Sequence, residues 1–182
     1  MAVQDLTKKL LADTLQSMLK STPLYKIHIK DLCAVCGVNR QTFYYHFHDK
    51  YELISWIYIQ DYNAAWHEVG CSYNEKLFCR MLEKMYEKHS FYKRVFDDSS
   101  QNCLREYMIK YHVENDTNAV VSYRGCDDLT LKEKYEIRSY AFSCVAHIIE
   151  WISDRSPCTI QELARLEYTF MPDILKHAYY VD

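Results

Sequence analysis

An all-α fold is predicted by three features of the sequence. The chain of 182 residues is 49% hydrophobic, and it contains only 3 glycines and 3 prolines. Because Gly and Pro mark the turns between short strands, their scarcity argues against a β-rich chain. Long stretches also repeat apolar residues at helical spacing. This length suits one compact unit, or a small domain joined to a larger one.

The first helix is expected from about Gln4 to Lys20, and Ser21-Thr22-Pro23 end it. Its apolar stripe consists of Leu6, Leu10, Leu11, Leu15, Met18 and Leu19. A second, short helix is predicted over residues 30–35, followed by Gly37, which tolerates the left-handed backbone of a helix end. This is the tight turn that a helix-turn-helix requires.

A third helix is predicted over residues 40–47, with Asn39 as its N-cap. Phe43 and Phe47 share one face, so a polar face is left opposite them. Arg suits a guanine edge, Gln an adenine edge and Thr a thymine methyl, whereas tyrosine hydroxyls suit phosphates. The expected DNA contacts are Lys30, Arg40, Gln41, Thr42, Tyr44, Tyr45, His46 and Lys50.

Within this set, Arg40 and Gln41 are the predicted base readers, Thr42 suits either task, and the others are expected to hold phosphates. The alternative is an exposed polar helix face without a partner. Asp49 and Glu52 have capping-box spacing, so a fourth helix is predicted to start near Lys50. Its free amides and the Lys50 ammonium would favour a phosphate.

The segment IKDLCAVCGVNRQTFYYHFHDKYELI resembles the DNA-binding signature of the TetR family of transcriptional regulators. The matching positions are Val38, Thr42, Phe43, Tyr44, Phe47, Lys50, Glu52 and Leu53. The resemblance covers roughly residues 5–60. RQTFYYHF followed by ELISWIY is also similar to a subgroup of dihydroxyacetone-kinase operon regulators. The resemblance implies a homodimer whose body holds a small effector.

The predicted domains are a helix-turn-helix DNA-binding domain over 1–50 and a helical regulatory and dimerisation domain over 51–182. Within the body, helices are expected over 50–69, from 75 to a break at His89-Ser90, and over 91–96, 101–113, 131–154 and 160–175, with an irregular segment after Val113. The last two helices can pair with their symmetry mates in a four-helix dimer interface. The alternative is that they close a monomeric core.

Charge is unevenly distributed along the chain, although the net charge is only -3. Residues 1–55 hold 7 Lys/Arg against 5 Asp/Glu, and the remainder holds 15 against 20. A weakly basic N-terminal segment and an acidic remainder suit a protein that contacts DNA with its N-terminal segment. The start lacks a secretory signal and no apolar run spans a membrane, so a cytoplasmic protein is expected.

The sequence nominates no catalytic, metal or cofactor site. It contains no HExxH, GxSxG or Gly-rich phosphate loop, so an enzyme is not expected. The 8 cysteines are expected to be reduced. Cys33-x-x-Cys36 has metal-like spacing but no second CxxC, and core packing is the favoured interpretation.

The body is rich in aromatic and imidazole side chains that suit an effector pocket. They are Trp66, Tyr86, His89, Tyr107, Tyr111, His112, Tyr140, His147 and Trp151. The predicted ligand contacts are Trp66, Tyr86, His89, Tyr107, Tyr111 and His147. Aromatic residues at helical spacing also pack plain cores, which is the alternative.

The predicted function is a TetR-type regulator that binds double-stranded DNA as a homodimer on a near-palindromic operator. A small-molecule effector or a co-regulator is expected to act on the body. The alternative is a regulator-like interaction module that works through a co-regulator and binds DNA weakly.

Overall fold

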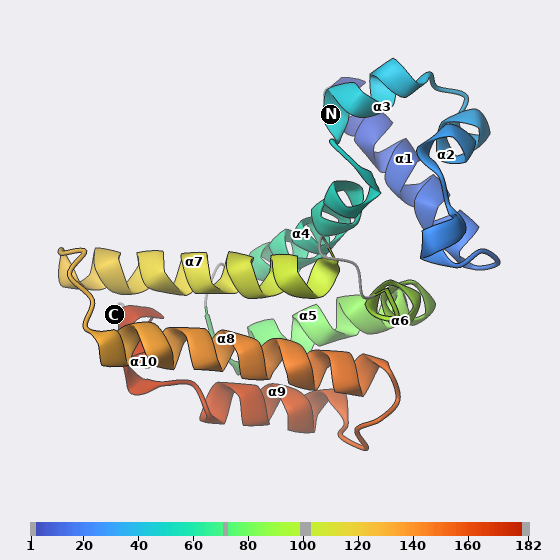
Figure 1. Ribbon diagram of the computed structural model, residues 1–182. Helices are drawn as coiled ribbons and strands as arrows, with labels where there is room; N and C mark the ends of the chain where they lie inside the picture. Colours follow the sequence, from blue (N-terminus) through green and yellow to red (C-terminus); the bar gives the residue numbers. More distant parts are fainter. Residues whose placement is uncertain (1–2, 71–72, 99–102, 180–182) are drawn as a thin grey trace.

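Ten α-helices and one short 3₁₀ turn form the described part of the chain in this computed structural model (Figure 1). The structure describes residues 3–70, 73–98 and 103–179, and these ranges contain no β-strand, which confirms the all-α prediction. In chain order the elements are α1 (Val3–Leu19), η1 (Leu24–Lys26), α2 (Ile29–Cys36), α3 (Arg40–His46), α4 (Lys50–Glu68), α5 (Glu75–Glu87), α6 (His89–Phe96), α7 (Leu104–Arg124), α8 (Leu131–Ile152), α9 (Ile160–Thr169) and α10 (Asp173–Tyr179).

Helices α1, α2 and α3 form a small unit that stands apart from the long helices of the body (Figure 1). α1 packs against α2, and α2 packs against α3. The buried side chains that hold this unit together include Leu11, Leu15, Leu19, Ile27, Leu32, Phe43 and Phe47. Leu6 and Leu10, which the predicted stripe included, are exposed. The core of this unit therefore begins at Leu11.

The turn between α2 and α3 has the predicted geometry. Gly37 adopts a left-handed conformation with φ 70°, which only glycine adopts without steric cost. The Val38 N–H then donates to the Cys33 carbonyl oxygen at 3.1 Å. This bond closes the end of α2 and sends the chain directly into α3.

Helix α4 connects the small unit to the body, because it packs against α1 as well as against α5 and α7. Its first turn is capped by Asp49, whose Oδ1 accepts from the N–H groups of Tyr51 and Glu52 at 2.8 Å each. Glu52 Oε2 accepts from the His48 N–H rather than from the Asp49 N–H, so the predicted capping box is shifted by one residue. The domain division at residues 50 and 51 falls at the start of this helix and remains a prediction.

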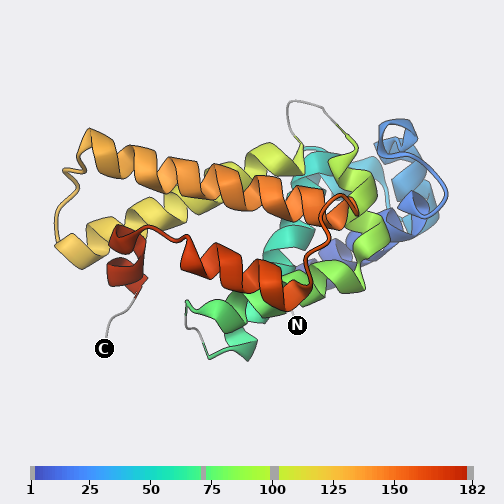
Figure 2. The ribbon, with the colours of Figure 1, turned by 90° about the horizontal axis from the view of Figure 1, so that it is seen from below.

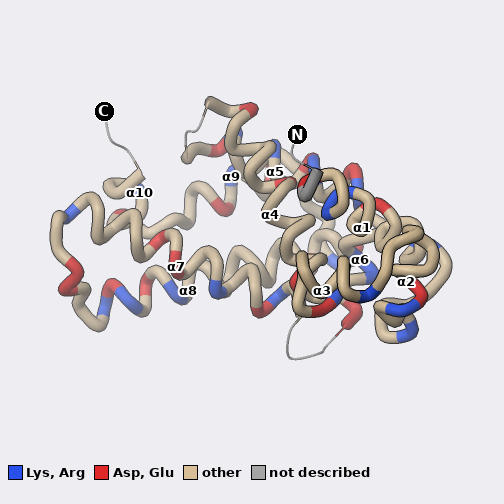
Figure 3. Tube along the Cα trace, turned by 90° about the horizontal axis from the view of Figure 1, so that it is seen from above, with Lys and Arg blue, Asp and Glu red and all other residues tan. Residues whose placement is uncertain are grey.

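The body is built on α7 and α8, two long antiparallel helices that pack along each other (Figures 1 and 2). α9 packs against α5, α10 packs against α7, and α6 lies between the body and α1. α8 runs along one edge of the body (Figures 2 and 3).

The prediction that α7 ends near Val113 was wrong, because the helix continues to Arg124. Asp116 and Val120 extend its buried face, and packing against α8 and α10 stabilises a segment whose Asn, Asp and Thr residues favour helices weakly. Gly125, with φ 69°, ends the helix. A prediction from residue types alone therefore underestimated the length of this helix.

The prediction of one final helix through Leu175 was also wrong. α9 ends at Thr169, and α10 starts at Asp173 after Pro172. Proline has no N–H to donate and disfavours helical backbone in the residue before it, so the break falls there. The predicted capping box of Thr159 and Glu162 at the start of α9 is confirmed. No helix in the described ranges is long and apolar enough to cross a membrane.

Candidate nucleic-acid interface

The fold of the small unit determines which side of α3 faces solvent. Phe43 and Phe47 are 0% and 3% exposed, so the helix is fixed by its aromatic side. At its start, Asn39 Oδ1 accepts from the Thr42 N–H at 2.7 Å. This N-cap stabilises a helix of only seven residues.

The opposite side of α3 presents the predicted DNA-contacting side chains. Arg40 and Gln41 are exposed, and Tyr44 and Tyr45 are 55% and 70% exposed. The helix that carries these four residues, α3, lies at the outer end of the small unit (Figure 1). An arginine, an amide and two phenol groups on one accessible helix face match the donors and acceptors that read base edges and phosphates.

Thr42 and His46 are half-buried rather than fully accessible. The Thr42 hydroxyl donates to Asn39 Oδ1 at 3.0 Å, so it takes part in the N-cap. The His46 ring lies between the rings of Tyr45 and Phe47, with centroid distances of 5.0 and 6.4 Å. Both residues border the exposed face, and their DNA contacts remain predictions.

Lys50 has a role inside the protein that the sequence did not reveal. Its Nζ donates to the carbonyl oxygens of Leu24 and Ile27 at 2.7 and 3.1 Å. Burial lowers the pKa of Lys50, while the charges of Asp98 and Asp49 oppose this shift. The amides expected to receive a phosphate beside it bond to the Asp49 carboxylate instead. Lys50 therefore ties the start of α4 to the segment between α1 and α2.

Lys and Arg positions are spread along the backbone of this unit (Figure 3). Lys30 is exposed in the first turn of α2.

Cys33 is buried in the core of the unit and Cys36 is half-buried, as the packing interpretation of this pair expected. Burial raises the pKa of the Cys33 thiol. Within the described ranges, no three His, Cys, Asp or Glu side chains lie together as a metal site.

The body contains a partly open cavity of about 50 Å³ between α4, α5, α7 and α8. Its lining consists of Tyr58, Tyr62, Tyr73, Leu77, Phe78, Met81, His112, Asp116, Tyr140, Ala141, Cys144, Val145 and Ile148. None of the six predicted ligand contacts belongs to this lining. His112 and Tyr140, which belong to the wider aromatic set, do line the cavity.

The six predicted ligand contacts lie elsewhere in the body. Tyr86 is 58% exposed on α5, and His89 and His147 pair with Asp154 and Glu167. Tyr111 lies behind the cavity wall, with its ring centroid 5.7 Å from that of Tyr62. The remaining two, Trp66 and Tyr107, are half-buried against the core. The six residues therefore lie outside the lining of this cavity, and their contact with a ligand remains a prediction.

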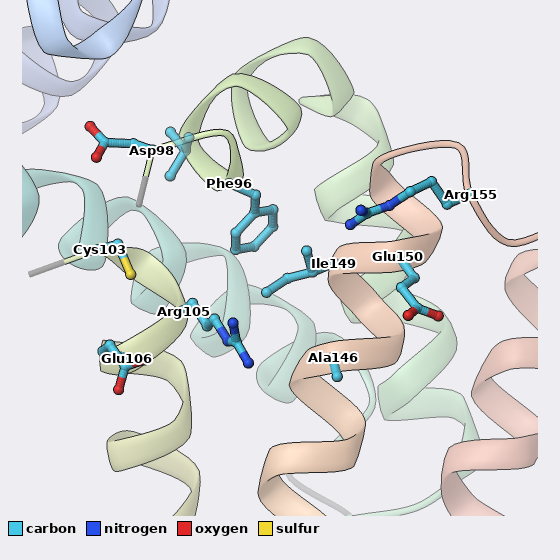
Figure 4. A pocket seen from close by; sticks show the side chains of 10 residues that line it. Phe96, Asp98, Cys103, Arg105, Glu106, Ala146, Ile149, Glu150 and Arg155 are labelled. Carbon is cyan, nitrogen blue, oxygen red and sulfur yellow. The ribbon is translucent and has the colours of Figure 1, made fainter. Parts of the chain in front are cut away.

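A larger cleft of about 640 Å³ opens on the surface between α6, α7 and α8 (Figure 4). Phe96 and Ile149 point toward each other across it, and Arg105 projects into the space between α7 and α8 (Figure 4). Asp98, Glu106, Glu150 and Arg155 place charges of both signs around it. Since this cleft is open to water, it shelters a small molecule less than the interior cavity does.

The assignment to a protein family rests on the sequence of the body. A family model described as a transcriptional regulator C-terminal region, TetR_C_8, matches residues 74–173, more than half of the 182 residues. The chain belongs to the TetR family of transcriptional regulators. The match begins just before α5 and ends at the start of α10, so it is independent of the helix-turn-helix segment that resembled the family.

Two further comparisons agree with TetR-family membership. The HTH-type dhaKLM operon transcriptional activator DhaS of Lactococcus lactis subsp. lactis (strain IL1403) is 29% identical over 94 residues, which are 50% of this chain and 49% of DhaS. The chain thus matches about half the length of this curated relative. A solved structure described as the dihydroxyacetone kinase operon activator DhaS is 20% identical, with a TM-score of 0.59 over 93% of this chain and 94% of that chain. This second likeness shows the shared fold.

Proposed function

We propose that this TetR-family protein binds double-stranded DNA as a homodimer and places one α3 helix of each subunit in the major groove. The observation that carries this proposal is the two-sided character of α3. Its Phe43 and Phe47 side is buried, and its Arg40, Gln41, Tyr44 and Tyr45 side is exposed. A helix held by its apolar back can enter a groove without unfolding its support.

The contacts are assigned by chemistry and exposure. Arg40 and Gln41 read base edges, and the Thr42 methyl suits a thymine. Tyr44, Tyr45, His46 and Lys30 hold phosphates. Lys50 positions the helix-turn-helix in place of the predicted phosphate contact, because its ammonium already bonds to two carbonyl oxygens.

The dimer is proposed to form through α8 and α9. Leu131, Tyr135 and Phe142 on α8, Leu166 on α9 and Phe170 directly after α9 are between 37% and 74% exposed. Large exposed apolar side chains on the two helices indicate a protein interface. Two subunits would then present their α3 helices about 34 Å apart to a near-palindromic operator. The interior cavity is the proposed effector site, and a DNA-bound regulator implies a cytoplasmic location.

Fluorescence anisotropy with purified protein tests the DNA-binding proposal. The first DNA to test lies upstream of dihydroxyacetone kinase genes in the same genome, because the DhaS relative is named as an activator of such an operon. We expect selective binding to this DNA over scrambled DNA. The double variant Arg40→Ala/Gln41→Ala should lose about 1–3 kcal/mol on the right site and most of its selectivity.

The matched control is Arg105→Ala/Gln60→Ala, which removes the same two side-chain types from exposed positions on α7 and α4. It should bind like the wild type. Equal selectivity of the α3 variant and the wild type would disprove the assigned readers. If the purified protein binds no DNA alone but binds after a partner protein is added, the co-regulator alternative is favoured.

A further inference from the structure

The interior cavity contains a carboxylate that differs from the other buried acids. Asp61, Asp116, Glu133 and Glu167 are the buried acidic residues of the described ranges. Three of them have a basic partner, since Asp61 pairs with Lys88, Glu133 with Arg124 and Glu167 with His147. Within the same ranges, Asp116 pairs with no basic side chain. Its hydrogen-bond partner is the Tyr179 hydroxyl, which donates to Oδ1 at 2.6 Å.

One hydrogen bond from Tyr179 does not offset the free-energy cost of burying a charged carboxylate at Asp116. The residue is 2% exposed, and a buried carboxylate is costly unless it is paired and fully hydrogen-bonded. His112, one turn earlier on α7, does not supply the charge, because burial lowers its pKa to about 4 and keeps it neutral. Its Nε2 instead lies 2.6 Å from the Tyr58 hydroxyl. Asp116 therefore lines a cavity that lacks a positive charge.

Aromatic rings form much of the remaining wall. Tyr62, Tyr73, Phe78 and Tyr140 line the cavity together with Asp116, and they come from α4, α5, α8 and the segment before α5. The Tyr73 ring stacks on the Tyr179 ring at 3.9 Å between centroids. Tyr179 therefore contacts both Asp116, through its hydroxyl, and Tyr73, through its ring. Aromatic faces attract cations, and the attraction is strongest away from water. Rings and a buried carboxylate together form a receptor for a positively charged group.

We propose that this cavity binds a small organic ammonium ion, with Asp116 as its counter-ion and the tyrosine and phenylalanine rings as its walls. The inference rests on the proposed function, in which this cavity is the effector site. Because a cavity of roughly 150 Å³ holds the six carbons of benzene, a volume of about 50 Å³ has room for roughly two non-hydrogen atoms. The ligand is therefore of the size of methylammonium.

The charge state of Asp116 predicts how pH affects binding. Burial raises its pKa to about 7, and the Tyr179 hydrogen bond opposes this shift. The titratable groups around it are Tyr62 on α4, Tyr73 before α5, Tyr140 and Cys144 on α8, Tyr179 on α10 and His112 on α7. Burial raises the pKa of each of these tyrosines and of the Cys144 thiol above its usual value, so they stay neutral near pH 7. A ligand that keeps its positive charge over this pH range should thus bind about tenfold more weakly one pH unit below this pKa than one unit above.

Methylammonium is the probe, and methanol is its uncharged counterpart of similar size. The full-length protein is titrated with each, and binding is followed by the nuclear magnetic resonance signals of backbone amides. We expect methylammonium to shift amides of α4, α7 and α8 around the cavity, with the stated pH dependence. Methanol should bind at least tenfold more weakly.

Asp116→Asn keeps an acceptor for Tyr179 but removes the charge, and it should weaken methylammonium binding about tenfold or more. Asp173→Asn is the matched control, because it makes the same change at an exposed position on α10 and should leave binding unchanged. Folding of both variants is checked by circular dichroism.

Equal binding of the two probes, or of Asp116→Asn and wild type, would overturn the proposal, as would shifts confined to the protein surface. Should Asp116→Asn fail to fold, the pH dependence and the comparison of the two probes in the wild type decide the question. None of these measurements contains DNA. If the cavity does not bind the ammonium probe, the proposal of operator binding is not affected. If the protein does not bind operator DNA, the result for the ammonium probe is not affected.

Discussion

The Tyr92 hydroxyl donates to Asp61 Oδ2 at 2.6 Å, and this bond joins α6 to α4 inside the body. Lys88 Nζ donates to the other carboxylate oxygen at 2.6 Å. Burial, followed by the charge of Asp61, raises the pKa of Tyr92 well above its usual value, so the hydroxyl keeps its proton. Because α6 also packs against α1, this cluster lies on the route between the body and the DNA-binding unit.

Replacing Asp61 should destabilise the protein. Asp61→Ala leaves a buried hydroxyl and a partly buried ammonium without their acceptor, so we expect a loss of about 1–3 kcal/mol in the free energy of unfolding. Tyr92→Phe removes one bond and should cost about 1 kcal/mol. Urea denaturation measures both. Asp13→Ala, at an exposed position of α1, is the control and should change stability by less than about 0.5 kcal/mol. Equal stability of Asp61→Ala and this control would contradict the prediction.

Lys50 and Lys30 should behave differently when DNA binding is measured at several salt concentrations. Lys30→Ala removes a proposed phosphate contact, so the slope of log affinity against log salt should flatten by about one. Lys50→Met should lower affinity and stability by about 1–2 kcal/mol through the lost carbonyl contacts while keeping the slope. Lys132→Ala on the exposed side of α8 is the control. A flattened slope in Lys50→Met would restore the phosphate role for this residue.

The proposed dimer predicts an effect of charge on α8. Tyr135→Glu places a carboxylate among exposed apolar side chains, where pairing of two subunits would bury it. We expect the variant to elute as a monomer in size-exclusion chromatography with light scattering, whereas the wild type elutes as a dimer. Tyr123→Glu changes a tyrosine of 54% exposure on α7 and should remain dimeric. If Tyr135→Glu also stays dimeric, this part of α8 lies outside the interface.

Asp116 should make stability fall as pH rises from about 4 to 7. The pKa of its carboxyl is about 7 in the folded protein against a usual value of 3.8, so the folded state holds a proton that the unfolded state has released. Raising the pH through this window therefore favours unfolding, by about 4 kcal/mol when the folded pKa is passed.

Asp116→Asn removes this dependence. In urea denaturation without ligand, its stability relative to wild type should increase between pH 4 and pH 7.5 and then level off. His112 contributes the opposite trend, because its pKa is lowered to about 4, but it is present in both proteins and cancels in the difference. A difference that stays constant with pH would show that Asp116 is ionised throughout.

Several elements of the DNA-binding unit could be predicted because their signals are local. Asn39, Gly37 and Asp49 act on groups within three or four residues of themselves, as N-caps or as a turn. The alternation of buried Phe43 and Phe47 with exposed Arg40 and Tyr44 follows from the helical period. Such local signals do not depend on which other segments pack around them.

The lining of the interior cavity could not be predicted in the same way. Tyr107 and Tyr111 have the residue type and helix expected of pocket residues, yet Tyr58, Tyr62 and Asp116 occupy the lining. A helical repeat specifies a face, but the rotation of each helix against its neighbours depends on packing between distant segments. An aspartate in a polar run also gave no sign that it would be buried.

The sequence by itself therefore determined the helical class, the helix-turn-helix and the side of α3 that is exposed to solvent, because periodicity and capping operate within a few residues. Only the tertiary structure decided that Lys50 bonds to Leu24, 26 residues away, and that Tyr179 bonds to Asp116, 63 residues away. These contacts depend on how whole helices pack, and packing determines which polar groups lose water and which partners they find there.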